Sequence, residues 1–241
     1  MIDTAGVKCM LFDLDGTLVD SMAYWRALSV HQARSCYAHL EGYTDELESQ
    51  ITVLPYPQAR ELIAKTFSLP LESVKTDREY TRGMMKLFYR DYIGEKKEAC
   101  RILRDSHRRG IKTALLTATR LSIMGDVLAR LDLLPYIDLI LTPDDYPEGK
   151  QTADIFFGAL AHFGATPEQA LLFEDSLYSI ELAHSLGIRT IGVEDWISRF
   201  DRARICELVD EFVCLGESIH EVDQAVLDAC EKEFGRGAFL G

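Results

Sequence analysis

Residues 7–21 read VKCMLFDLDGTLVDS, an apolar run that passes directly into two aspartates and a glycine. The apolar residues of VKCMLF are nearly continuous, which is typical of a strand buried on both faces of a parallel sheet. Ligands of open α/β sheets bind outside the carboxyl ends of the strands, and Asp13 and Asp15 lie at that end. Residues two apart at a strand end point to the same side. This stretch therefore predicts a parallel α/β sheet with a carboxylate-bearing site at the end of its first strand.

The same kind of short apolar run recurs four more times, with helical segments between the runs. The runs are KTALLT, DLILT, ALLF and RTIGV, ending at Thr117, Thr142, Phe173 and Val193, and EFVCL near the C-terminus is a weaker candidate. Three of the helical segments end at glycines, as helices often do. This alternation of strands and helices predicts an α/β fold with a Rossmann-like, doubly wound parallel sheet.

One long stretch interrupts the alternation. Between Val19 and Ile93 there is no convincing buried strand, only helix-like patches separated by prolines. Such a stretch is too long for an ordinary loop. We therefore expect a Rossmann-like catalytic core made of residues 1–17 and 94–241, with a helical domain of residues 18–93 inserted after the first strand.

The composition excludes some kinds of partner. The chain carries 26 Lys and Arg against 39 Asp and Glu, a formal net charge of −13. Nucleic-acid backbones are bound by clustered basic residues, and no apolar run approaches the ~20 residues that span a bilayer, so we expect neither a nucleic-acid nor a membrane partner. The six cysteines have no metal-ligand spacing and the N-terminus has no targeting segment, so we expect reduced thiols and a cytoplasmic protein.

Three further predicted strand ends bring polar residues to the edge of the sheet that carries Asp13. Thr117 closes the second strand and, with the amides of the following TATR, can hold an anion. Lys150 follows the third strand, and Glu174 and Asp175 follow the fourth. Adjacent carboxylates repel each other unless a cation is present, so this pair indicates a site for a hard metal ion.

Each of these residues also has an ordinary structural interpretation when it is taken alone. The Asp-Leu-Asp-Gly segment can be a polar turn, Thr117 and Asp175 can cap helices, and most lysines lie in water at the surface. Taken together, two acid pairs, a threonine and a lysine suit phosphoryl transfer. That reaction can use a carboxylate nucleophile, a magnesium ion and donors to the phosphoryl oxygens.

Four segments resemble the motifs of the haloacid dehalogenase-like hydrolase superfamily, in its phosphatase and β-phosphoglucomutase-like branch. FDLDGTLVDS resembles the first motif, LLTAT the second, GKQTADIF the third and LLFEDSLYSIELAHSLGI the fourth. The insertion after the first motif resembles the helical cap domain of that superfamily in position and character. The resemblance covers essentially the whole predicted core, and it implies a Rossmann-like fold with an inserted α-helical cap.

The resemblance implies a chemical role for each of four acidic residues. Asp13 is expected to be the nucleophile that forms an aspartyl-phosphate. Asp15 is expected to protonate the leaving alcohol and later to deprotonate the attacking water. Mg²⁺ is the expected cofactor, held by the carboxylates of Asp13 and Asp175 and the main-chain carbonyl of Asp15, with Glu174 adjacent or acting through water.

Substrate-binding roles follow from the same motifs. Thr117 and the amide of Ala118 are expected to hold phosphoryl oxygens, and Lys150 is expected to bridge the phosphate and the nucleophile. Trp25 follows the first motif closely, and we take it as a candidate contact for the leaving group because its ring can stack on a sugar or a base.

Departures from the family pattern bear on the choice of function. Gln151 stands where the third motif usually has proline, Ser179 where members with a Gly-Asp fourth motif often have aspartate, and Trp25 where β-phosphoglucomutase-like members have histidine. We predict a magnesium-dependent phosphatase acting on a small phosphate monoester, such as a sugar phosphate, a nucleotide or phosphoglycolate. The alternatives are a sugar-phosphate mutase and a non-catalytic phosphate-binding protein, and the oligomeric state stays open.

Overall fold

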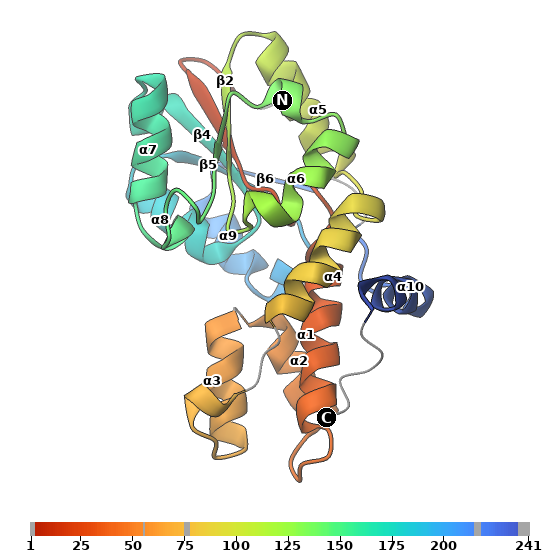
Figure 1. Ribbon diagram of the computed structural model, residues 1–241. Coiled ribbons are helices and arrows are strands. Elements are labelled where there is room, and N and C mark those ends of the chain that lie inside the picture. Colours follow the sequence, from red (N-terminus) through yellow and green to blue (C-terminus); the bar gives the residue numbers. More distant parts are fainter. Residues whose placement is uncertain (1–2, 55, 75–77, 215–217, 236–241) are drawn as a thin grey trace. The chain divides into compact units, whose positions relative to one another are not determined.

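The chain divides into two compact units, each made of two segments (Figure 1). The computed structural model describes residues 3–54, 56–74, 78–214 and 218–235. The first unit comprises Met1–Met22 and Tyr89–Ile219, and the second comprises Ala23–Phe88 and His220–Gly241. Among the described residues, every strand belongs to the first unit, and the second unit is helical.

A six-stranded parallel sheet forms the centre of the first unit. Its strands are β1 (Cys9–Phe12), β2 (Lys112–Leu116), β3 (Leu139–Leu141), β4 (Ala170–Glu174), β5 (Arg189–Val193) and β6 (Glu211–Val213). They lie in the order β3-β2-β1-β4-β5-β6, and each neighbouring pair is parallel. The order reverses at β1, and such a switch point is where open α/β sheets bind ligands. The predicted fold class, a Rossmann-like doubly wound sheet, is confirmed.

Helices cover both faces of this sheet. They are α5 (Lys97–Arg108), α6 (Leu121–Arg130), α7 (Asp154–Phe163), α8 (Leu177–Ser185) and α9 (Arg202–Leu208). Figure 1 shows α5 and α6 on one face and α7 and α8 on the other. Successive strand residues point to opposite faces: Leu11 belongs to the apolar cluster of α7 and α8, whereas Phe12 stacks on Phe173 with ring centroids 4.6 Å apart. Burial on both faces explains why the strand sequences are continuously apolar.

The insertion between β1 and α5 is helical. Its α-helices are α1 (Met22–Tyr37), α2 (Asp45–Val53), α3 (Tyr56–Thr66) and α4 (Arg78–Asp91). The Thr44 hydroxyl accepts the N–H of Leu47 (3.1 Å) and so caps the start of α2. Tyr37, Ile51 and Ile63 are among the residues of the buried apolar cluster that joins α1, α2 and α3. Five short 3-10 helices complete the described structure: Leu71–Ser73, Leu134–Tyr136, Gly149–Gln151, Pro167–Gln169 and Ile197–Phe200.

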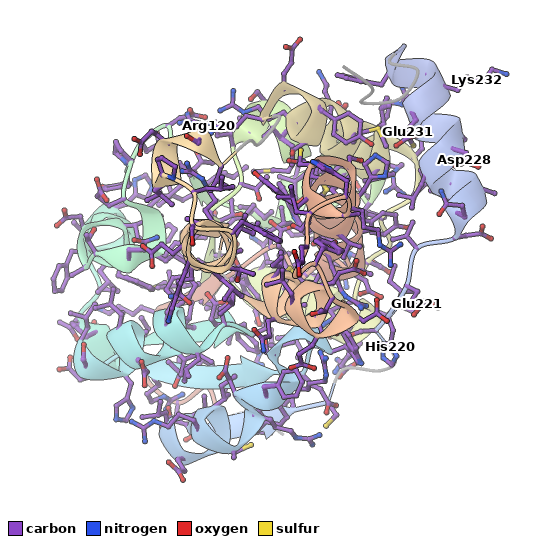
Figure 2. The ribbon with its side chains drawn as sticks, turned by 90° about the horizontal axis from the view of Figure 1, so that it is seen from below. Arg120, His220, Glu221, Asp228, Glu231 and Lys232 are labelled. Carbon is purple, nitrogen blue, oxygen red and sulfur yellow. The ribbon has the colours of Figure 1, made fainter. Side chains whose placement is uncertain are left out.

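The C-terminal helix α10 (Gln224–Phe234) packs with the helical unit. Tyr80 on α4 donates a hydrogen bond from its hydroxyl to Glu231 Oε1 (2.6 Å). Its ring also meets the ring of Phe234 edge-on, with centroids 5.9 Å apart. Figure 2 shows Glu231 on this helix between Asp228 and Lys232.

The grouping of α10 differs from the boundaries expected from the sequence. Those boundaries place all of 94–241 in the core, whereas the compact units of the structure group the chain from His220 onward with 23–88. The division into a core domain of residues 1–17 and 94–241 and a helical domain of residues 18–93 stays a prediction.

Two smaller expectations can be compared with the structure. All six cysteines lie in the described part of the chain, and none of them is in a disulfide. Within that same part, no helix combines the length and the apolar character that crossing a membrane requires.

Candidate functional site

Three neighbouring strands end at the same edge of the sheet, and each delivers a polar residue there. Asp13 follows β1, Thr117 follows β2, and Glu174 is the last residue of β4. The backbone N–H groups of Asp13 and Thr117 still donate across the sheet, to the carbonyls of Phe173 (3.0 Å) and Leu141 (3.1 Å). The sheet therefore fixes the backbone that carries these side chains.

Asp13, Glu174 and Asp175 form a buried cluster of carboxylates. One oxygen from each residue lies within 4.8 Å of the oxygens from the other two. Carboxylate oxygens are the preferred ligands of hard divalent cations such as Mg²⁺ and Ca²⁺. The residues present therefore fit a divalent metal ion.

Lys150 brings a positive charge into this cluster. It lies in the 3-10 helix Gly149–Gln151, and its side chain is buried. Its ammonium donates to Asp13 Oδ1 (2.5 Å) and to Glu174 Oε2 (2.6 Å). The glutamine at position 151, where the family pattern has proline, thus does not keep the lysine away from the carboxylates.

The charges in the cluster do not balance. Burial raises the pKa of Asp13 well above its usual range, Glu174 raises it further, and Lys150 opposes both effects. Burial also raises the pKa of Asp175, with added repulsion from Glu174 and Asp195. Burial lowers the pKa of Lys150, but the attraction of Asp13 and Glu174 outweighs burial and leaves it well above the usual value. The cluster has three carboxylates, and the ammonium of Lys150 is bonded to two of them, so a divalent cation would supply the missing positive charge.

Three hydroxyl groups hold the carboxylate of Asp15. Oδ1 accepts hydrogen bonds from the hydroxyls of Ser21 (2.6 Å) and Tyr89, and Oδ2 accepts one from Thr119 (2.7 Å). None of these three residues was predicted from the sequence. Ser21 and Thr119 belong to the first and second motif segments, where they could have been found, but no local pattern connects Tyr89, near the end of α4, with Asp15.

Gly16 lies directly against Asp175. Its φ is +85°, and a Cβ at this position would lie 2.5 Å from Asp175 Oδ2. Glycine adopts such a φ without steric penalty and has no Cβ to collide with the carboxylate. The turn after β1 therefore brings backbone, and not only side chains, into contact with the cluster.

The remaining predicted site residues are placed differently. Thr117 is buried, and its hydroxyl accepts the N–H of Thr119 (3.0 Å), while Ala118 between them is exposed. Trp25 lies on α1 in the helical unit, and its carbonyl accepts the hydroxyl of Ser29 (3.1 Å). Its contact with a substrate stays a prediction.

A doubly wound sheet with acids and a buried lysine at its switch point is an α/β fold with a carboxylate-centred candidate site. The chain belongs to the haloacid dehalogenase-like hydrolase family, whose model matches residues 10–193. The family resemblance of the four motifs is therefore confirmed.

Named relatives are consistent with this membership. A phosphorylated carbohydrates phosphatase from Thermotoga maritima is 26% identical over 186 residues, covering 77% of this chain and 84% of the relative. A phosphoglycolate phosphatase from Salmonella paratyphi A is 28% identical over 207 residues, covering 78% and 81%. A candidate β-phosphoglucomutase from Thermotoga maritima has a solved structure that matches with a TM-score of 0.63 at 23% identity, over 94% of this chain and 99% of that one. This last likeness shows a shared fold.

Proposed function

We propose that this chain is a magnesium-dependent phosphatase that hydrolyses a small phosphate monoester through an aspartyl-phosphate on Asp13. The observation that carries the proposal is the buried ammonium of Lys150, bonded to Asp13 and Glu174 in a cluster that also contains Asp175. One site thus offers a carboxylate nucleophile, a cation to accompany an anionic substrate and a set of metal ligands.

The metal would be held by the carboxylates of Asp13 and Asp175 and the main-chain carbonyl of Asp15, with Glu174 bound directly or through water. Mg²⁺ commonly binds through one or two carboxylates together with substrate phosphate oxygens. When bound, it neutralises negative charge and polarises the phosphoryl group. Family membership and the donor set both support this choice of metal.

Asp13 and Asp15 divide the reaction between them. In the first step, a carboxylate oxygen of Asp13 forms a bond to phosphorus, the bond to the leaving oxygen breaks, and Asp15 donates its proton to that oxygen. In the second step, water attacks phosphorus, Asp15 takes the proton from the water, and the bond between Asp13 and phosphorus breaks. The carboxylate of Asp15 accepts three hydrogen bonds and has about four lone-pair sites, so one site is left for the proton that it transfers.

The other expected residues have binding roles in this proposal. The Thr117 oxygen accepts an N–H, which leaves its own hydrogen to donate to a phosphoryl oxygen, and the N–H of Ala118 is the second donor. Lys150 orients Asp13 and lowers the repulsion that a phosphate dianion meets. Trp25 is the proposed contact for the leaving group.

The substrate class rests on the relatives. Their names specify phosphorylated carbohydrates and phosphoglycolate, which supports a small phosphate monoester as the substrate here. We also propose a cytoplasmic location without nucleic-acid or membrane partners, which the six cysteines outside disulfides and the acidic composition support.

The test is release of free phosphate from a panel of sugar phosphates, nucleotides and phosphoglycolate, with Mg²⁺ or with a chelator. We expect release that requires Mg²⁺ and that Asp13→Asn abolishes. Isomerised product without phosphate release would identify a mutase instead. If wild type and Asp13→Asn both leave the whole panel unchanged, the chain is a phosphate-binding protein and the proposal fails.

A further inference from the structure

A second buried lysine lies beside the cluster and belongs to none of the four motifs. Lys96 follows the helical insertion and is only 6% exposed. Its ammonium donates to the carbonyl of Gly16 (2.6 Å), the carbonyl of Glu194 (2.8 Å) and Asp195 Oδ2 (2.7 Å). An ammonium has three hydrogens, and all three are used. Lys96 therefore has none left for a substrate phosphate, and its role must lie in what it holds.

Two segments meet at this ammonium, the turn after β1 and the loop after β5. In the loop, Asp195 is buried, and its Oδ1 accepts the N–H of Ile197 (3.0 Å) at the start of the 3-10 helix Ile197–Phe200. In that short helix, Ser198 donates its hydroxyl to Asp175 Oδ2 (3.2 Å). The ion pair of Lys96 and Asp195 thus fixes the segment from which Asp175 receives a hydrogen bond.

The turn after β1 reaches the same carboxylate. Gly16, whose carbonyl Lys96 holds, lies so close to Asp175 that a Cβ would sit 2.5 Å from Oδ2. Lys96 is therefore hydrogen-bonded to the turn after β1 and to the loop after β5, and both segments contact Asp175. Asp195 is hydrogen-bonded to the N–H of Ile197 in the second of these segments. Buried ion pairs with their hydrogen bonds satisfied can impose a specific arrangement on their surroundings.

We propose that Lys96 and Asp195 are positioning residues for metal binding, which hold Gly16 and Ser198 against Asp175 and so fix the orientation of its carboxylate. This inference rests on the proposed function, because it takes Asp175 as a metal ligand. Groups that orient metal ligands from outside the coordination shell commonly change metal affinity by about 10- to 100-fold when they are removed.

Charge and positioning predict opposite results for the loss of Lys96. An ammonium close to the cluster repels a metal ion, so by charge alone Lys96→Met would tighten Mg²⁺ binding. The influence of Lys96 on the pKa of Asp175, which it lowers, shows that its charge is felt there. If Lys96 positions Asp175, its loss weakens binding in spite of that charge.

Isothermal titration calorimetry with MgCl₂ alone separates these two results. We expect the Kd of Lys96→Met to be about ten-fold above that of wild type. Lys97→Met is the matched control, because Lys97 is the exposed neighbour, and its Kd should equal that of wild type. A folded Lys96→Met protein with equal or tighter binding overturns the inference.

Lys96→Met leaves the buried carboxylate of Asp195 without its ion-pair partner, and this variant could fail to fold for that reason. Two further variants keep the test decisive in that case. Lys96→Met/Asp195→Asn removes both charges and leaves the net charge of the site unchanged, so weaker Mg²⁺ binding in this protein reports positioning alone. Ser198→Ala removes a single hydroxyl and should weaken binding about three- to ten-fold. Wild-type affinity in these variants overturns the inference. Wild-type protein that binds no Mg²⁺ overturns the proposed function as well, so the two failures are distinguishable.

Discussion

Asp175 is a buried carboxylate whose neighbours are themselves acidic. Burial raises its pKa, and so do the charges of Glu174, Asp195 and Asp13. Its oxygens accept hydrogen bonds from the hydroxyls of Thr17 (3.5 Å) and Ser198 (3.2 Å). Hydroxyls of this kind compensate a buried charge only in part, so the metal-free protein carries an unfavourable charge at this residue.

Replacement of that charge should stabilise the metal-free protein. Asp175→Asn keeps the shape of the side chain, so in chelator we expect the free energy of unfolding to rise by about 1–3 kcal/mol. Added Mg²⁺ should stabilise wild type but not the variant. Chemical denaturation in chelator and in Mg²⁺ measures both effects. Asp138→Asn is the control and should lose stability, because Asp138 is paired with Lys112 (3.1 Å). An Asp175→Asn protein that is less stable than wild type in chelator argues against this account.

The same raised pKa values give the metal-free protein a pH dependence. Asp13 and Asp175 have a higher pKa in the folded state than in the unfolded state, so the folded state binds more protons above the ordinary carboxyl pKa of about 4. The free energy of unfolding in chelator should therefore be lower at about pH 7.5 than at about pH 5.5. Mg²⁺ binds the ionised carboxylates and should reduce or reverse this difference. Urea denaturation at both pH values measures how the free energy of unfolding changes with pH. A protein that is more stable at the higher pH in chelator contradicts this prediction.

At the scale of elements, the strand ends explain which site residues the sequence could predict. Asp13, Thr117 and Glu174 follow from the rule that parallel strands of a doubly wound sheet end at one edge. Lys150 follows the third strand in the sequence, but its contact with Asp13 depends on the path of the loop between β3 and the 3-10 helix Gly149–Gln151, which no local pattern encodes. Tyr89 and Lys96 lie where the insertion returns to the sheet, and their contacts join segments that are far apart in the sequence.

The turn after β1 can be tested through its glycine. Gly16→Ala places a Cβ against Asp175 at a φ of +85°, so we expect a loss of about 1–3 kcal/mol in the free energy of unfolding and weaker Mg²⁺ binding. Gly125→Ala on α6 is the matched control. Its Cβ would meet Leu121 at an ordinary 3.7 Å, and alanine favours a helix interior by about 1 kcal/mol. Thermal unfolding with and without Mg²⁺ compares Gly16→Ala with Gly125→Ala. Equal stability and an equal effect of Mg²⁺ in the two variants would show that the turn tolerates a side chain.

At the scale of the whole molecule, the chain extends beyond the range that the family model matches. The family model ends at residue 193, whereas α10 lies beyond it and packs with the helical unit. The sequence could not predict this grouping, because Tyr80 and Glu231 are distant along the chain and neither lies in a motif. Their hydrogen bond depends on tertiary packing.

The contact between α10 and α4 can be tested at Gly83. A Cβ at Gly83 on α4 would collide with the ring of Phe234. Gly83→Ala should therefore displace α10 and increase hydrogen exchange of the amides in Gln224–Phe234, even though alanine favours the helix α4 itself. Exchange measured by mass spectrometry on wild type and variant tests this. Unchanged protection of α10 would mean that its contact with α4 is not close.

The central claim is that Asp13 becomes phosphorylated during magnesium-dependent turnover. The direct measurement is to mix the protein with Mg²⁺ and a phosphate monoester that it hydrolyses, and to quench the reaction in acid within the first turnover. The peptides are then analysed by mass spectrometry. The account predicts one phosphoryl group on the peptide that contains Asp13, absent with chelator and absent in Asp13→Asn. Magnesium-dependent phosphate release at an undiminished rate by Asp13→Asn, with no phosphorylated Asp13 peptide in wild type, would contradict it.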